Sequence, residues 1–165
     1  MRLIDNKIDQ TYDELEVGRV FRSGGRTITE TDVVNYCAFT GNWIEIHSNV
    51  NYASKTRFGR RLVQGALTYS ILTGLIQFGL GIQANYGIDN MRFLAPVDIN
   101  DTIYAVCEVI RKKEKDAKYG VTTFLLKAVN QNGVTVQQGE WSLLMLRSRE
   151  DLDALIASSL PEFQS

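Results

Sequence analysis

The residues whose types and spacing suggest chemistry are His47, the only histidine of the chain, and Gly65, which begins a long uncharged stretch. An imidazole titrates near neutral pH, so His47 is a candidate general acid or base. If the stretch is a helix, its first turn presents unpaired N–H groups and the positive end of the helix dipole. Gly65 has no side chain, so a carbonyl can approach its N–H closely. The pair predicts a base beside a donor for a developing oxyanion, although a lone histidine is more often a surface or satisfied core residue.

The stretch from Gly65 to Gly81, GALTYSILTGLIQFGLG, predicts the central element of the fold. Its apolar residues fall all round a helical wheel, which predicts a long helix buried on nearly every side. It is too short, and too broken by polar residues such as Thr68 and Gln77, to span a membrane. Another element must therefore wrap around it.

The second half of the chain supplies strands for that purpose. Alternating or β-branched segments predict strands, and Asn132-Gly133 predicts a two-residue hairpin turn between the last two. These strands are expected over Tyr86–Phe93, Thr102–Arg111, Tyr119–Asn130 and Val134–Arg147. The sequence thus predicts an α+β fold in which an antiparallel sheet wraps around the central helix.

Two capping boxes mark further helices. Thr29–Asp32 is expected to open a helix that ends at Thr40-Gly41, and Ser148–Asp151 is expected to open a C-terminal amphipathic helix. The apolar residues of that C-terminal helix, which should dock on the body, are Leu152, Leu155 and Ile156. A strand over Arg19–Ser23 and a helical turn over Val50–Ser54 complete the prediction.

Composition narrows the function. The 165 residues are 44% apolar and 22% charged, which is typical of one domain covering residues 1–165. A net charge of -1 argues against a nucleic-acid surface or a membrane anchor. Cys37 and Cys107 fit no metal spacing and are expected to be reduced, packed thiols. The N-terminus lacks the apolar run of a signal peptide, so a cytoplasmic protein is expected.

The segment from Tyr36 to His47, YCAFTGNWIEIH, resembles the hydratase motif of the MaoC-like dehydratases, the (R)-specific enoyl-CoA hydratase group. The similarity extends through Phe58–Leu67 and Arg92–Val97 and covers about residues 12–147, leaving 148–160 as a helical extension. The resemblance implies a hotdog fold. It also implies a homodimer or a multiple of one, which agrees with the need to cover exposed sheet edges.

The resemblance also implies roles for individual residues. In such enzymes an Asp and a His hold and activate the water that adds across a 2-enoyl thioester, while an amide at the head of the central helix polarises the thioester carbonyl. A hydroxyl further along the helix supports the Asp. Carried across, the His is His47, the amide is that of Gly65 and the hydroxyl is that of Thr73, whereas the Asp position is Asn42.

The chain departs from the motif at several positions. Asn42 is nearly isosteric with Asp, but an amide cannot accept a proton at neutral pH. Ile44 and Glu45 stand where the motif has Asn and Pro, and Gln64 stands where a His commonly precedes the helix glycine. Half of the acid–base pair is therefore missing, and Glu45 is either a replacement carboxylate or a solvated loop residue.

Four further residues are candidates for substrate binding. Trp43 and Tyr69 either line an acyl channel or pack in the core. Arg60 and Arg61, in a basic loop with Lys55 and Arg57, either meet the phosphates of coenzyme A or of a carrier-protein arm, or are solvated. No separate cofactor is implied, because coenzyme A or phosphopantetheine is part of the substrate.

The leading interpretation is a hydro-lyase acting on an enoyl or 3-hydroxyacyl thioester, with altered chemistry at Asn42. A site with one base is also compatible with double-bond isomerisation or another proton transfer alpha to the thioester. The alternative is a non-catalytic subunit that binds acyl thioesters or partners a dehydratase. The acyl group, and the choice between coenzyme A and acyl carrier protein, are left open.

Overall fold

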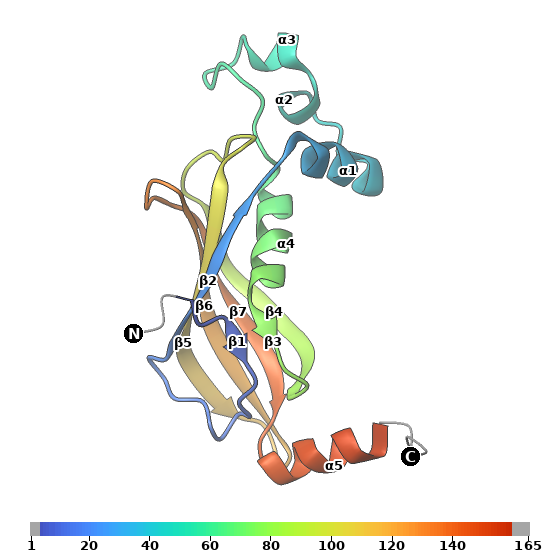
Figure 1. Cartoon of the computed structure of the whole chain (residues 1–165), viewed down its shortest axis with the longest axis vertical. Helices are drawn as coiled ribbons and strands as arrows, with labels where there is room; N and C mark the ends of the chain where they lie inside the picture. The colour runs from blue at the N-terminus through green and yellow to red at the C-terminus, as the bar shows by residue number, and fades with distance from the viewer. Residues whose placement is uncertain (1–3, 160–165) are drawn as a thin grey trace.

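A five-stranded antiparallel sheet and the helix on its inner face form the body of the protein (Figure 1). The computed structural model describes residues 4–159. The sheet has the order β2 (Val20–Thr27), β5 (Thr102–Glu114), β6 (Tyr119–Asn130), β7 (Thr135–Leu146) and β4 (Ile82–Phe93). It curves around α4 (Gly65–Leu75), which confirms the predicted α+β arrangement.

Alternation along the strands builds the core. On β5, Ile103, Ala105, Cys107 and Val109 are all fully buried, as the period of two in the sequence predicts. They belong to the same buried cluster as Leu67, Ile71 and Leu72 of α4. Burying an aliphatic side chain of this size contributes about 1.5–3 kcal/mol, so this interface fixes α4 on the sheet.

The central helix is shorter and less enclosed than the sequence predicts. It ends at Leu75, because Gln77 and Phe78 leave the helix as β3 (Gln77–Phe78) and pair with β1 (Lys7–Ile8) in a small parallel sheet. Asn6 Nδ2 then donates a 2.8 Å hydrogen bond to the free Leu75 carbonyl. The prediction of burial on nearly every side is also wrong for a single chain, since a stripe of α4 is exposed. Its exposed positions are Ala66, Ser70 and Gly74.

Several strand boundaries differ from the prediction: β4 begins at Ile82 and not at Tyr86, and β5 runs past Arg111 to Glu114. Two further differences have a reason in turn geometry. β2 runs past Gly24-Gly25 to Thr27, because a register shift between Arg22 and Gly25 absorbs the glycines into the β2–β5 ladder. The β6–β7 turn has three residues, not two, between the hydrogen-bonded pair Asn130 and Val134. Asn130 accepts from Gly133 at 3.0 Å and donates to Val134 at 2.9 Å, with Gly133 in the left-handed region at φ +76.

Three helices project beyond one end of the sheet (Figure 1). They are α1 (Glu30–Thr40), α2 (Glu45–Ser48) and α3 (Val50–Ala53). The predicted capping box of α1 is present, with Thr29 and Asp32 bonding each other's backbone N–H. Gly41 ends α1 at φ +73, where its N–H donates to the Cys37 carbonyl at 2.9 Å. This left-handed cap turns the chain from α1 toward α2.

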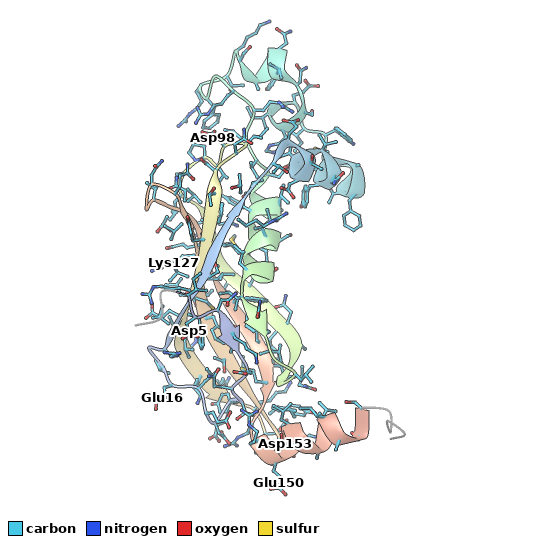
Figure 2. The ribbon with its side chains drawn as sticks, viewed as in Figure 1. Asp5, Glu16, Asp98, Lys127, Glu150 and Asp153 are labelled. Atoms are coloured by element: carbon cyan, nitrogen blue, oxygen red, sulfur yellow. The ribbon has the colours of Figure 1, made fainter. Side chains whose placement is uncertain are left out.

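The C-terminal helix α5 (Arg149–Ser159) lies at the opposite end of the molecule. Figure 2 shows its Glu150 and Asp153 far from Asp98, which lies near α3. The Asp151 N–H donates to Ser148 Oγ at 3.1 Å, as predicted for the helix cap. Docking is confirmed for Leu152, which is 3% exposed, and is wrong for Leu155, which is 39% exposed. Ile156 is half-buried. Residue 160 of the predicted extension lies outside the described residues. No helix within residues 4–159 is long and apolar enough to cross a membrane.

Candidate active site

Helix α2 holds His47 against the segment that leads into α4. The His47 Nδ1 atom lies 2.8 Å from the Leu62 carbonyl oxygen, and the Leu62 N–H donates to the Ile46 carbonyl at 3.2 Å. A carbonyl oxygen only accepts, so this contact assigns the proton of a neutral imidazole to Nδ1. The Nε2 atom then keeps its lone pair. His47 is therefore held in the tautomer that a general base requires.

The head of α4 is left without a side-chain cap. Its N-cap residue is Gln64, which is 1% exposed and points its amide away from the helix start, donating from Nε2 to Cys37 Sγ at 3.0 Å. Within residues 4–159, no side chain bonds the first N–H groups of the helix. Uncapped N–H groups at the positive end of a helix dipole suit a developing negative charge. The prediction for the Gly65 amide is thus compatible with the geometry.

A second reason for glycine at position 65 is the ring of Phe93. A Cβ atom on Gly65 would lie 2.3 Å from Phe93 Cε1, so the ring or the helix would have to shift to accept it. Phe93 stands at the end of β4 and is paired with Gln137 of β7. Neither Phe93 nor Gln137 was predicted as a site residue. The only sequence signal was the resemblance across Arg92–Val97, which gives Phe93 no role.

Asn42 follows the left-handed cap of α1 and is half-buried. Its N–H donates to Thr40 Oγ1 at 3.2 Å, which orients the residue. Its side-chain oxygen Oδ1 is buried and has no hydrogen-bond partner in the described part of the chain. A buried carbonyl oxygen without a donor is unfavourable by about 1–3 kcal/mol, so this position calls for a water molecule or a substrate hydroxyl.

Two predicted residues lie further along α4. The Thr73 hydroxyl donates to the Ser70 carbonyl at 2.8 Å, and between residues 4 and 159 no hydrogen bond joins it to Asn42. Tyr69 packs edge-to-face on Trp141, with ring centroids 6.2 Å apart. Burial raises the pKa of Tyr69 to about 12, so its hydroxyl stays protonated at neutral pH. Tyr69 therefore combines a core contact with a buried hydroxyl that has no partner among residues 4–159.

The loop between α1 and α2 exposes its apolar side chains. Trp43 is 52% exposed and Ile44 is 60% exposed, so neither closes a channel within one chain. Glu45 is also exposed and accepts a hydrogen bond from Asn49 Nδ2. Glu45 is thus a solvated residue, as one of the two predictions has it, but it is the first residue of α2 and not part of a loop. Its carboxylate is engaged by Asn49 at the start of α3.

The basic loop before α4 divides into paired and unpaired cations. Arg60 donates to both oxygens of Asp98 at 2.6 and 2.7 Å, and Arg61 donates to both oxygens of Glu30 at 2.9 and 2.6 Å. The hydrogen bonds from Arg61 hold the pKa of Glu30 below its ordinary value. Both guanidinium groups are thus occupied by carboxylates of the same chain. Arg57 has no carboxylate partner among the described residues. Its guanidinium carbon lies over the Phe58 ring, 5.1 Å from the ring centroid.

Two hollows lie beside α4. One is a cavity of about 350 Å³ between the head of α4, the loop before it and the ends of β4 and β7. Its lining includes Arg57, Leu62, Gly65, Phe93 and Gln137. The other is an open groove of about 540 Å³ between α1 and the exposed side of α4.

Comparisons with known proteins identify the family. The family model described as "MaoC like domain" matches residues 14–130. The chain is 34% identical over 106 residues to the protein MaoC of Klebsiella aerogenes, covering 63% of this chain and 32% of that protein. It is 31% identical to the 3-hydroxybutyryl-CoA dehydratase of Methylorubrum extorquens, covering 59% of this chain and 62% of that protein. The chain thus spans about a third of the first protein and under two thirds of the second.

Solved structures agree on the fold. A structure described as a monoamine oxidase regulatory protein from Archaeoglobus matches with a TM-score of 0.82 at 32% identity, covering 88% of this chain and 99% of that one. An R-hydratase of Pseudomonas aeruginosa matches with a TM-score of 0.68 at 28% identity, covering 84% and 86%. A double-hotdog protein of Mycobacterium tuberculosis shares the fold, with a TM-score of 0.78 at 17% identity over 86% of this chain and 46% of that one. With a sheet wrapped around a central helix and a family match over most of its length, this chain belongs to the MaoC-like domain family and has the hotdog fold.

Proposed function

We propose that this chain is a hydratase or dehydratase of enoyl or 3-hydroxyacyl thioesters, with His47 as its acid–base group. The observation that carries the proposal is the contact between His47 Nδ1 and the Leu62 carbonyl. It holds the His47 ring against Leu62, which lies three residues before the uncapped head of α4. It also leaves the Nε2 atom of the ring free to act as a base. Relatives named (R)-specific enoyl-CoA hydratase and 3-hydroxyacyl-thioester dehydratase support the class of reaction.

The proposed hydration uses one base twice. His47 Nε2 takes a proton from water as the water oxygen bonds to the β-carbon, and the electron pair of the double bond moves onto the thioester oxygen. The Gly65 N–H stabilises that oxyanion. Collapse of the enolate then takes the proton from His47 onto the α-carbon, so the imidazole returns neutral. Dehydration is the same sequence in reverse.

Asn42 holds the water in this proposal and does not take its proton. Its buried Oδ1 accepts a hydrogen bond from the water, which satisfies an oxygen that has no donor in the described residues. Because an amide cannot become the second base, the reaction depends on His47 alone and is expected to be slow. This dependence makes the altered acid–base pair testable.

The function is tested by the hydration of crotonyl-CoA, followed by separating and quantifying 3-hydroxybutyryl-CoA. We expect slow product formation by the unmodified protein and a fall of at least about tenfold in His47→Ala. His47→Asn is the matched control, because an asparagine keeps a donor for the Leu62 carbonyl and lacks a base. Equal loss in both variants supports the base role.

Other outcomes would favour other functions of this site. An active His47→Asn variant would reduce His47 to an anchor for Leu62. Calorimetric binding of crotonyl-CoA without any turnover would favour the non-catalytic acyl-thioester-binding subunit. Presenting the same acyl group on an acyl carrier protein distinguishes the carrier, because only the true carrier should lower KM.

We also propose that the working unit is a homodimer or a multiple of one. The edge strand β4 pairs on one side only, and its Tyr86 and Phe93 are 56% and 64% exposed. On α1, beside the groove along α4, Phe39 is 91% exposed. A second chain would cover these surfaces and the exposed stripe of α4.

Light scattering on the eluting protein is expected to give at least twice the chain mass of 18.6 kDa. Ser70→Arg places a bulky charge on the exposed stripe of α4 and should lower the mass toward that of one chain. Asp153→Arg on α5, at the far end of the molecule, should leave it unchanged (Figure 2). A single-chain mass for the unmodified protein at micromolar concentration would contradict the dimer.

A further inference from the structure

The cavity of about 350 Å³ at the head of α4 has a mostly apolar wall, and its polar side chains are those of Arg57, Thr68 and Gln137. Gln137 lines this cavity and is 1% exposed. Its Nε2 donates only to the Met91 sulfur at 3.2 Å, and its Oε1 has no partner in the described part of the chain. Exchanging the two ends of the amide would leave one of them equally unsatisfied. A buried amide so poorly paired calls for a ligand or a water.

The register of the sheet places Gln137 close to the head of α4. Gln137 is paired with Phe93 across the β4–β7 ladder, and the Phe93 ring lies against the Cα side of Gly65. Thr68, one turn along the helix from Gly65, lines the same cavity and is fully buried. A ligand whose carbonyl accepts from the Gly65 N–H can therefore extend past the Phe93 ring to Gln137.

The lining decides which half of a thioester enters. A thioester carbonyl carries an acyl chain on one side and a sulfur arm on the other, and the acyl side must meet His47. His47 does not line the cavity, whereas Arg57 does. Arg57 is the guanidinium of its loop without a carboxylate partner among residues 4–159. A cation and an amide in the lining suit a polar arm that ends in a phosphate, and the apolar residues beside them suit the methylene groups between the polar atoms of that arm.

We propose that this cavity holds the sulfur arm of the substrate, and that the Gln137 side-chain carbonyl accepts a hydrogen bond from the amide N–H of that arm, two carbons beyond the sulfur. This inference rests on the proposed function, because it assumes that the thioester carbonyl bonds the Gly65 N–H. It makes Gln137 a specificity-determining residue for cysteamine-type thioesters, whichever carrier bears them. Arg57 faces the more distant phosphate end of the same arm.

A pair of short substrates isolates this hydrogen bond. S-crotonyl-N-acetylcysteamine carries the amide N–H, and the crotonyl thioester of 2-mercaptoethyl acetate carries an ester oxygen in its place. We expect the unmodified protein to favour the amide by about tenfold or more in kcat/KM, because the ester leaves the Gln137 oxygen without a donor. Where turnover of the short substrates is too slow to follow, their inhibition constants against crotonyl-CoA give the same ratio.

Gln137→Leu should bring the ratio of amide to ester close to one. Gln138→Leu is the matched control, because neighbouring strand residues point to opposite faces, and it should keep the ratio. Gln137→Met provides a second variant of similar length if the leucine protein does not fold.

The outcomes separate the two proposals. A ratio near one in the unmodified protein, or a ratio that survives in Gln137→Leu or Gln137→Met, overturns the role of Gln137 while crotonyl-CoA hydration still supports the function. A protein that neither turns over nor binds crotonyl-CoA overturns the function, and the inference fails with it.

Discussion

Replacing Asn42 with aspartate is expected to raise the rate of crotonyl-CoA hydration by about 10²–10⁴-fold, the range typical of a general acid–base group. The two side chains are nearly isosteric, and Asn42 is already oriented by the bond from its N–H to Thr40. Its Oδ1 atom has no partner within residues 4–159 that the new carboxylate would lose. The carboxylate can then share the proton of the attacking water with His47.

Two controls define this gain. Adding His47→Ala to Asn42→Asp should abolish it, since the carboxylate needs the imidazole to complete the proton transfer. Asn51→Asp makes the same amide-to-carboxylate change at an exposed position of α3 and should leave the rate unchanged. Thermal melts of each variant separate a loss of rate from a loss of folded protein.

Two results would contradict the account of Asn42. Ordinary enzyme rates in the unmodified protein would mean that an ordered water or another group already replaces the carboxylate. A variant that binds crotonyl-CoA and gains nothing would mean that Ile44 and Gln64 have changed the site for other chemistry or for binding alone. In that case isomerisation of the double bond is the next reaction to assay.

The parts of the fold that the sequence predicts well are those set by local interactions. The capping box of Thr29 and Asp32 and the strand over Tyr119–Asn130 both lie where local chemistry places them. The end of α4 is not predicted correctly, because the segment after Leu75 is apolar enough to continue a helix. It turns instead into β3, which pairs with β1 about seventy residues earlier in the chain. Helical periodicity carries no information about that distant partner.

The same distinction applies to the site. His47, Asn42 and Gly65 follow from a motif that is continuous in sequence. The ion pairs of Arg60 with Asp98 and of Arg61 with Glu30 join residues 38 and 31 positions apart. The sequence alone therefore predicts a basic loop but not the carboxylates that pair with it. Gln137 is likewise found only through the β4–β7 register, because an isolated glutamine on a predicted strand carries no signal of its burial.

Substituting Gly65 with alanine is expected to lower kcat/KM by about 10²–10³-fold, the usual effect of removing one oxyanion donor. The added Cβ would lie 2.3 Å from Phe93 Cε1, so the ring or the head of the helix must move. Overpacking in a well-packed core destabilises a fold by about 1–3 kcal/mol, and because the Phe93 ring is 64% exposed we expect a loss near or below the lower end of that range. A lower kcat/KM in the single variant therefore has two causes, steric strain and a crowded N–H at residue 65, and kinetics alone does not separate them.

The double variant Gly65→Ala/Phe93→Ala separates these causes, because it removes the ring that the new methyl would strike. We expect its melting temperature to exceed that of Gly65→Ala, while kcat/KM stays low, since the methyl still crowds the carbonyl at the N–H of residue 65. Phe93→Ala alone reports the contribution of the ring to the wall of the cavity. If activity instead returned together with stability in the double variant, Gly65 would be required only to accommodate Phe93. The oxyanion donor would then have to be sought among the next N–H groups of α4, those of Ala66 and Leu67, which share the uncapped first turn of the helix.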